Sequence, residues 1–247
     1  MVNKLNTDKL SVRLGTVAKY VPKDSRVADI GSDHAYLPSY LVKNGQITFG
    51  IAGEVAKGPF QSAEKNVMAE GLSDMISVRL GDGLEVIQPG DVDCITIAGM
   101  GGSLISSILE SGKNKLTGVN RLILQPNINA SAIRNWMVEN SWELIAEEII
   151  EEDNKIYEIL VAEKGEPLKP YREVSLECGL LVGPYLLQRK EKAFLKKWTL
   201  EKNNWKRIYE QLEGAAPTAE TEEKKQEVLK KISLVEGVLD HEESQWS

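Results

Sequence analysis

The chain has 247 residues, a formal net charge of −7 and 27% charged residues, which is enough for one α/β domain with a smaller additional unit. No apolar run is long enough to span a bilayer. The acidic total excludes a globally basic nucleic-acid binder. The first residues, MVNKLNTDKL, lack the apolar core of a signal peptide. We therefore expect a cytoplasmic protein without a membrane partner.

Cysteine and histidine are too scarce for a metal centre. Cys94 and Cys178 are far apart and lack metal-ligand spacing, and only two histidines are present. A disulfide framework and a zinc site are both disfavoured by this pattern. We expect no metal.

Strands and helices alternate along the first two thirds of the chain. Leu10, Leu14, Val17 and Val21 recur at helical spacing and predict an amphipathic helix over 10–21. Helices are then expected at 37–45, 59–72, 103–112 and 131–141. Strand segments with their terminal turns are expected at 26–30, 47–55, 75–83, 92–102 and 121–127, with Pro126 ending the last.

A β-hairpin is expected to close this series. Two strand-like runs within 143–164 flank the turn signal Glu152-Asp153-Asn154. The alternation predicts an α/β fold with helices on both faces of the sheet. The prediction is a Rossmann-like, seven-stranded, mostly parallel sheet with an antiparallel last strand, which is the arrangement of class I methyltransferases that use S-adenosylmethionine (AdoMet).

The C-terminal third has a different pattern. Apolar residues recur at spacings near three, four and seven in two groups: Leu187, Phe194, Trp198, Trp205, Ile208 and Leu212, then Val228, Ile232, Val235 and Leu239. The segment GAAPTAE separates the groups. The pattern predicts an α-helical coiled-coil hairpin, and we divide the chain into an α/β domain, 1–165, and a helical domain, 166–247.

The loop after the first strand carries the first candidate ligand-binding residues. They are Asp29, Gly31, Ser32, Asp33 and His34. A parallel sheet binds ligands at the carboxyl ends of its strands, and the following helix start favours a carboxylate. Asp29 or Asp33 could accept a hydrogen bond from an amine. The methionyl end of AdoMet has both groups, whereas two carboxylates would repel a pyrophosphate. The alternative is a plain surface turn.

Three further strand ends add polar or glycine residues. Glu54 could bind both hydroxyls of a ribose, and Asp82 could accept from an adenine amino group; a solvated glutamate and an ordinary turn are the alternatives. The turn from Ala98 to Gly102 lacks the Asp/Asn-Pro-Pro-aromatic motif of many amino-methyltransferases. Its glycines suit either a flat ligand or tight packing. Gln125 and Asn127 could read a base edge or cap a turn.

A basic run follows in the C-terminal segment. Between residues 189 and 207 there are two acidic side chains, Glu191 and Glu201, and eight basic ones, a net +6: Arg189, Lys190, Lys192, Lys196, Lys197, Lys202, Lys206 and Arg207. A local basic helix can contact phosphates although the whole protein is acidic. The alternative is a solvated helix face. We expect Trp198 and Trp205 in the coiled-coil core.

Taken together, several segments resemble the bacterial tRNA (adenine(22)-N1)-methyltransferase family. They are VADIGSDHAYLP, IAGEVAKGPFQSAEKNV, VRLGDGLEV, IAGMGGSLI, LILQPN and EDNKIYEI, and GPYLLQRKEKAFLKKWTLEKNNW resembles the helical appendage of that family. The resemblance covers nearly the whole chain in order. It implies AdoMet as methyl donor and N1 of a tRNA adenine as acceptor.

The resemblance also implies residue roles. Asp29, Gly31, Ser32, Asp33 and His34 would surround the methionyl group, Glu54 would hold the ribose, Asp82 and Gly83 would lie at the cofactor adenine, and Ala98, Gly99 and Met100 would face the sulfonium. Our catalytic candidates are Asp33, Tyr36 and Asn127, with His34 as a structural or proton-shuttling group. Expected tRNA contacts are Arg13, Gln125, Asn127, Lys196, Lys197 and Lys206. The alternatives are a methyltransferase for a small molecule or protein, or a non-catalytic AdoMet-binding scaffold.

Overall fold

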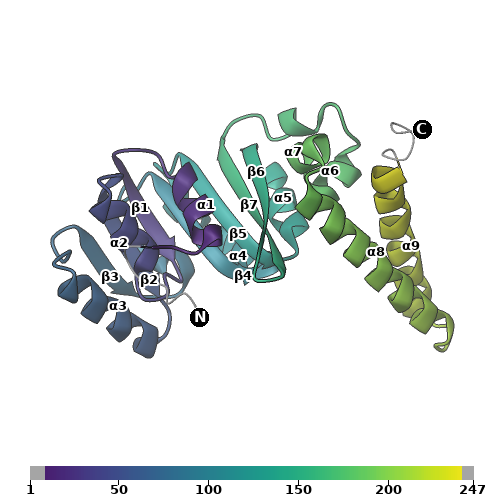
Figure 1. Cartoon of the computed structure of the whole chain (residues 1–247), viewed down its shortest axis with the longest axis horizontal. Coiled ribbons are helices and arrows are strands. Elements are labelled where there is room, and N and C mark those ends of the chain that lie inside the picture. Colours follow the sequence, from purple (N-terminus) through teal and green to yellow (C-terminus); the bar gives the residue numbers. More distant parts are fainter. Residues whose placement is uncertain (1–8, 241–247) are drawn as a thin grey trace. The chain divides into compact units, whose positions relative to one another are not determined.

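The computed structural model describes residues 9–240. The chain forms two compact units, Met1–Pro170 and Tyr171–Ser247. Figure 1 shows a sheet flanked by helices in the first unit and helices alone in the second. Within the described residues, no helix is both long enough and apolar enough to cross a membrane.

A seven-stranded sheet forms the centre of the first unit, in the order β3-β2-β1-β4-β5-β7-β6. The sheet is parallel except for β7, which lies antiparallel between β5 and β6. This confirms the predicted Rossmann-like sheet. The chain changes direction across the sheet after β3, so the switch point lies between β1 and β4. The strands are β1 Ser25–Ile30, β2 Ile47–Glu54, β3 Ile76–Leu80, β4 Cys94–Gly101, β5 Arg121–Ile128, β6 Trp142–Glu152 and β7 Lys155–Lys164.

Helices cover both faces of this sheet (Figure 1). Val17, Leu41 and Val67, one from each of the first three helices, share a buried cluster with Ile123 of β5. The next residue of β5, Leu124, is fully buried on the opposite face, where the fourth helix packs on β4 and β5. The helices of this unit are α1 Val12–Tyr20, α2 Tyr36–Lys43, α3 Lys57–Ala69, α4 Gly102–Ser111 and α5 Ala130–Glu139, with short 3-10 turns η1 Gly83–Val86, η2 Lys113–Leu116 and η3 Lys169–Tyr171.

Strand β5 continues through Pro126 to Ile128, so the expected stop at Pro126 is wrong. The strand continues because the neighbouring β4 carries a bulge at the same level. Ala98 pairs with Gln125 and Met100 pairs with Pro126, which leaves Gly99 without a ladder partner. A proline is tolerated where a bulge already interrupts the ladder.

The second unit begins with two short helices before the long pair. The helices are α6 Leu176–Val182, α7 Pro184–Arg189, α8 Lys192–Glu213 and α9 Ala219–Asp240. Gly183, with φ 91°, separates α6 from α7, and Lys190, with φ 44°, separates α7 from α8. Leu187 therefore belongs to α7 and not to the long helical hairpin. Helices α8 and α9 pack together along their length, as predicted.

An aromatic row runs along the packed side of α8. The ring centroids of Phe194 and Trp198 are 6.2 Å apart, and those of Trp198 and Trp205 are 6.1 Å apart. Phe194 and Trp198 are buried and Trp205 is half-buried. The tryptophans are therefore part of the helical core, as expected.

A buried ion cluster ties α5 to the β6–β7 hairpin. The Arg134 guanidinium donates to the carboxylates of Glu147 and Glu158, each at 2.7 Å, and all three side chains are almost fully buried. Without its arginine, the cluster would leave two carboxylates in an apolar interior. Such uncompensated charge is strongly destabilising.

We expect Arg134→Met to lower the free energy of unfolding by about 3–5 kcal/mol, because it strands Glu147 and Glu158. Urea denaturation followed by circular dichroism measures this. Lys113→Met is the matched control, because it removes a lysine from an exposed pair with Glu110 and should change stability by less than about 1 kcal/mol. Equal effects of the two substitutions would contradict the prediction.

Candidate active site

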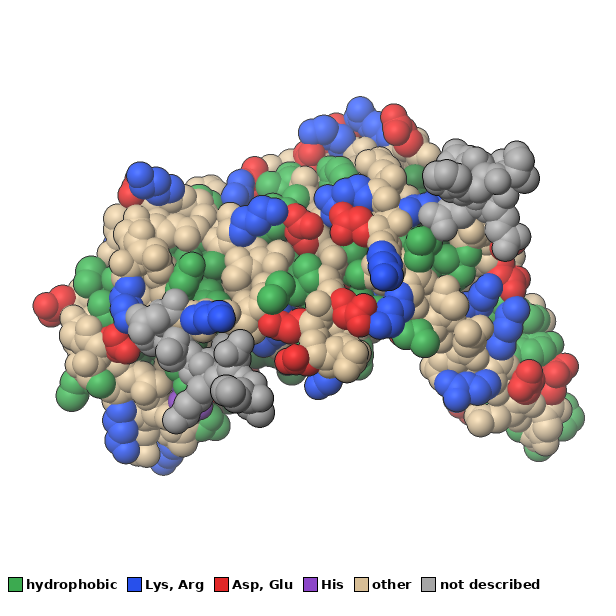
Figure 2. Space-filling model, viewed as in Figure 1, with side chains coloured by type: hydrophobic (Ala, Val, Ile, Leu, Met, Phe, Trp, Pro, Cys, Tyr) green, Lys and Arg blue, Asp and Glu red, His purple; other side chains and the backbone are tan. Residues whose placement is uncertain are grey.

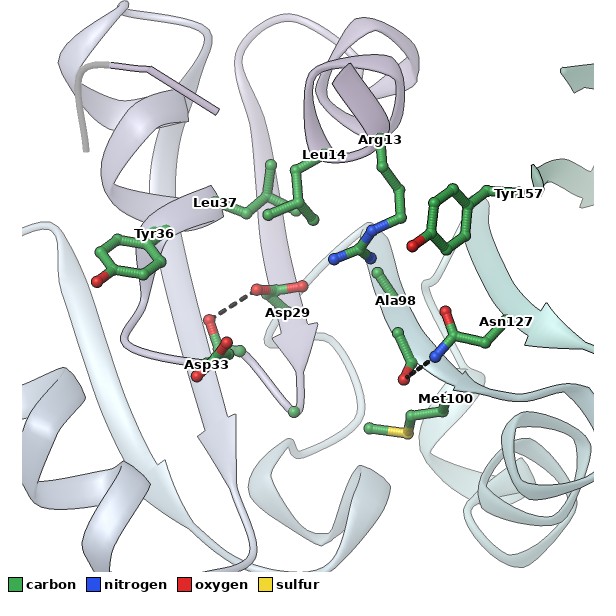
Figure 3. Close-up of a pocket in the computed structure, with 13 residues that line it drawn as sticks. Arg13, Leu14, Asp29, Asp33, Tyr36, Leu37, Ala98, Met100, Asn127 and Tyr157 are labelled. Carbon is green, nitrogen blue, oxygen red and sulfur yellow. Dashed lines mark hydrogen bonds between the residues drawn. The ribbon is translucent and has the colours of Figure 1, made fainter. Parts of the chain in front are cut away.

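A cavity of about 330 Å³ opens at the switch point of the sheet. Figure 3 shows side chains from α1, β1, α2, β4, β5 and β7 pointing into it. Three lining residues, Leu14, Leu37 and Tyr157, were not among the predicted ones. The predicted residues that the cavity brings together are Arg13, Asp29, Gly31, Ser32, Asp33, Tyr36, Ala98, Gly99, Met100 and Asn127.

Asp29 is a buried carboxylate at the end of β1. Only 4% of the residue is exposed, and its two oxygens accept hydrogen bonds from Ser32 Oγ and Thr96 Oγ1, both at 2.6 Å. Burial raises the pKa of Asp29, and these hydrogen bonds and the charge of Arg13 oppose that rise. Thr96 thus has a site role that the sequence did not reveal, because nothing in its spacing links it to Asp29.

The loop after β1 has an unusual backbone. Asp33, His34 and Ala35 have φ angles of 43°, 65° and 58°, so three successive non-glycine residues are left-handed. This conformation stores strain and persists only where surrounding contacts fix it. One contact is the Asp33 N–H, which donates to Glu54 Oε1 at 2.7 Å. A second contact is made by the Gly53 carbonyl, which accepts hydrogen bonds from the backbone N–H groups of the two residues before Asp33.

Glu54, Asp82 and Gly83 are not among the residues that line the main cavity. Glu54 is 6% exposed at the end of β2, and burial is the main cause of its raised pKa. Asp82 and Gly83 line a second cavity of about 370 Å³ between η1 and α4. The ribose and adenine roles of these residues stay predictions.

His34 points away from the cavity towards α3. Its Nδ1 is 2.8 Å from Ser62 Oγ, and its carbonyl accepts a hydrogen bond from the Asn66 side chain at 3.1 Å. Its Nε2 is 3.5 Å from the Asp33 carboxylate. Of the two expected roles, this arrangement favours the structural one, because the ring holds the strained loop against α3.

The glycine turn after β4 serves two separate needs. Gly99 has φ +82° and forms the bulge, which favours glycine. Gly102 serves packing, because a Cβ there would lie 1.9 Å from the carbonyl oxygen of Asn129. In the cavity, the Met100 side chain lies against Gly31, since a Cβ at Gly31 would overlap the end of that side chain.

Two side-chain amides hold the Gly99 turn in place. Gln125 Oε1 accepts from the Gly99 N–H at 3.0 Å and from the Arg13 guanidinium. Asn127 Nδ2 donates to the Gly99 carbonyl at 2.7 Å (Figure 3). Gln125 is fully buried beneath the cavity, and its Nε2 donates to the Pro126 carbonyl at 2.8 Å. Of the two roles expected for Gln125, the structure shows the second, in which its side chain holds a turn. The Asn127 side chain, by contrast, lines the cavity.

Arg13 lies inside the cavity at the first turn of α1. The backbone N–H groups of Val12 and Arg13 donate to the Glu152 carboxylate at 2.6 and 3.0 Å, which fixes this end of the helix to β6. The guanidinium carbon is 5.5 Å from the centroid of the Tyr157 ring. Tyr157 was missed, although the hairpin pattern EDNKIYEI placed it on a strand.

The predicted basic contacts of the second unit lie on α8. Lys196 is exposed, and Lys206 forms an ion pair of 2.7 Å with Glu236 of α9. The ammonium of Lys197 is 4.8 Å from the Trp198 ring centroid. Figure 2 shows Lys and Arg side chains over the α8–α9 hairpin, with acidic ones beside them.

The fold and the cavity together define a class I methyltransferase. The sheet has the single antiparallel strand of that class, and the cavity lies at the switch point between acidic and glycine-rich strand ends. The family model of tRNA (adenine(22)-N(1))-methyltransferases matches residues 27–237. The chain belongs to this family, which confirms the resemblance seen in the sequence.

Similar proteins span almost the whole chain. The tRNA (adenine(22)-N(1))-methyltransferase of Bacillus subtilis is 53% identical over 96% of this chain and 100% of its own. The crystal structure of the B. subtilis enzyme has a TM-score of 0.91, covering 94% of this chain and 99% of that one. A Streptococcus pneumoniae structure, described as a putative tRNA (m1A22) methyltransferase in complex with S-adenosyl-L-methionine, is 43% identical, has a TM-score of 0.78, and covers 94% and 100% of the two chains.

We expect Gly102→Ala to destabilise the protein by about 1–3 kcal/mol, because the new methyl group overlaps the Asn129 carbonyl. Thermal unfolding measures this. Gly58→Ala is the control, since a Cβ at Gly58 meets nothing within 4 Å. A Gly102→Ala protein as stable as the Gly58→Ala protein would contradict the prediction, because the β5–α5 turn would then move to accommodate the methyl group at little cost in stability.

Proposed function

We propose that this protein transfers the methyl group of AdoMet to N1 of adenine 22 in tRNA. The observation that carries the proposal is the cavity at the switch point, with an acidic wall on β1 and a glycine turn on β4. Membership in the family and the AdoMet complex of the S. pneumoniae relative support it. Because tRNA is the substrate, we place the protein in the cytoplasm.

The residues of the main cavity fit the methionyl end of AdoMet. The buried Asp29 and the exposed Asp33 are acceptors for its amine. Gly31 and Ser32 offer close backbone approach beside them. Glu54 would hold the ribose, and Asp82 and Gly83 the adenine, next to the second cavity. When bound, AdoMet supplies an electrophilic methyl group on a sulfonium.

Positioning is the main contribution of the protein to this reaction. Methyl transfer needs the adenine N1 in line with the methyl–sulfur bond, and holding that geometry accounts for much of the acceleration. The Gly99 turn, fixed by Gln125 and Asn127, forms the floor beneath the transfer point. The adenine becomes cationic as it is methylated. Of the catalytic candidates, the Asn127 side-chain oxygen is suited to stabilise that charge or the adjacent amino group, whereas Asp33 lies on the side of the cofactor amine.

Tyr36 remains a second catalytic candidate. It lines the cavity at the start of α2, and its ring is 5.3 Å from His34. The phenol could accept or donate a hydrogen bond there. Its place on the acidic side of the cavity favours a role at the cofactor.

We propose that α8 contacts tRNA phosphates. Lys196, Lys197 and Lys206 belong to a segment with a net charge of +6 in an otherwise acidic chain. Lysines on a helix bind phosphates as point charges and release counterions.

The direct test is methyl transfer from labelled AdoMet to tRNA transcripts that carry adenine or guanine at position 22. We expect transfer to the adenine transcript, release of 1-methyladenosine on digestion, and loss of transfer to the guanine transcript. Equal labelling of both transcripts would refute the assigned position. Labelling of a protein or small molecule in place of tRNA would support the other methyltransferase reading.

Replacing Lys196, Lys197 and Lys206 with glutamine should weaken tRNA binding and make it less salt-dependent. The slope of log K against log salt should fall in magnitude by about 0.7–0.9 per lost phosphate contact. Filter binding across a salt series measures the slope. The matched control replaces Lys224, Lys225 and Lys231, which each pair with a glutamate one turn away on α9. An identical slope in the two triple variants would exclude an α8-specific contact.

A further inference from the structure

Tyr157 lines the main cavity on the side opposite to Asp33 (Figure 3). It lies near the start of β7 and is half-buried. Within residues 9–240, its hydroxyl makes no hydrogen bond to another residue. A half-buried aromatic ring with an unused polar edge is typical of a binding surface.

The order of the strands determines the order of the residues across the cavity. Strands β1, β4, β5 and β7 are consecutive neighbours, and they carry Asp29, Gly99, Asn127 and Tyr157. The β5–β7 ladder pairs Leu124 with Leu160, and beyond its end Asn127 and Tyr157 both line the cavity. Figure 3 shows the same spatial order: Asp29 and Asp33 lie on one side, Met100 lies below, and Asn127 and Tyr157 lie on the other side.

The geometry of methyl transfer indicates which side of the cavity suits the cofactor and which side suits the adenine. Under the proposed function, the amine of the cofactor belongs beside Asp29, and its sulfonium faces the Gly99 turn. In-line transfer needs the nucleophile on the side of the methyl group opposite to the sulfur. The side of the cavity away from the acids is over β5 and β7, next to Asn127 and Tyr157, and we place the adenine there.

A base taken out of its stack needs a new surface, and an aromatic ring provides one. The β4 turn, Ala98 to Gly102, has no aromatic residue. The aromatic side chains that line the cavity are Tyr36, on the cofactor side, and Tyr157.

We propose that Tyr157 is the residue on which the target adenine stacks. This rests on the proposed function. Arg13 holds the ring in place, because its guanidinium lies over one face of the ring and is itself fixed by Gln125, so the base would stack on the other face. Glu152 anchors the helix end that carries Arg13. The stacking surface is thus ordered before the tRNA arrives.

The test compares Tyr157→Leu with Tyr157→Phe in the full-length protein. Base stacking on an aromatic ring is worth about 1–3 kcal/mol, so Tyr157→Leu should lower kcat/KM for adenine-22 tRNA by about 5- to 150-fold. Tyr157→Phe keeps the ring and should retain most of the activity. The dissociation constant of AdoMet, measured by calorimetry, should not change in either variant.

Phe49→Leu is the matched control. Phe49 is also a half-buried aromatic residue of a strand beside an arginine, with Arg26 4.4 Å from its ring centroid, but it lies outside the cavity. We expect its kcat/KM to equal that of the wild type. Wild-type kcat/KM in Tyr157→Leu would overturn the proposal. An equal loss in Tyr157→Phe would also overturn it, because the hydroxyl and not the ring would then matter.

A second measurement uses wild-type protein and does not depend on the folding of a variant. A tRNA with 8-azidoadenine at position 22 should cross-link to the peptide that contains Tyr157, as mapped by mass spectrometry. A cross-link to the peptide that contains Tyr36 would overturn the proposal. Absence of wild-type methylation at adenine 22 would instead remove the proposed function, and the stacking role with it.

Discussion

The buried amide of Gln125 is the interaction on which the rest of the site depends. The bulge in β4 deprives Gly99 of a ladder partner, and the Gln125 side chain takes over as acceptor for that N–H. The same oxygen receives the Arg13 guanidinium, so one amide joins β4, β5 and α1. A buried polar group without partners is destabilising. Loss of the Gln125 amide would therefore leave both the Gly99 N–H and the Arg13 guanidinium without this acceptor.

The acidic loop after β1 gives this parallel sheet a wall with the charge that a cationic ligand needs. Loops that bind pyrophosphate wrap it with glycine-supplied backbone. Here Asp29 is kept in position by two hydroxyl groups, and Asp33 stands in a strained stretch held by Glu54. The loop is thus rigid through side-chain contacts and does not need several glycines. The three successive strained residues lie next to the place where the methionyl group is expected.

Strand ends and turn signals predicted the fold and the acidic wall, because they depend on local periodicity and on one rule about parallel sheets. Asp29 and Asn127 were found in this way. Thr96 and Tyr157 were not, because each acts through a neighbour on another strand, and neither the strand order nor the register could be read from residue spacing. For Gln125 the sequence left a base contact and a turn cap open, because the bulge whose Gly99 N–H donates to its side chain cannot be recognised in the sequence GMGG. For Gly102, only the distance to Asn129 decided between ligand contact and packing.

The anchoring of α1 by Glu152 has a consequence for the order in which the protein forms. Val12 and Glu152 are 140 positions apart, so the first helix emerges from the ribosome long before its partner strand exists. Contacts of this separation are slow to form. The central strands can assemble during synthesis, but Arg13 reaches its place only after the β6–β7 hairpin has left the exit tunnel. The side of the cavity that carries Arg13 and Tyr157 is therefore the last part of the first unit to be completed, and a truncated or stalled chain would carry the acidic wall without the surface opposite it.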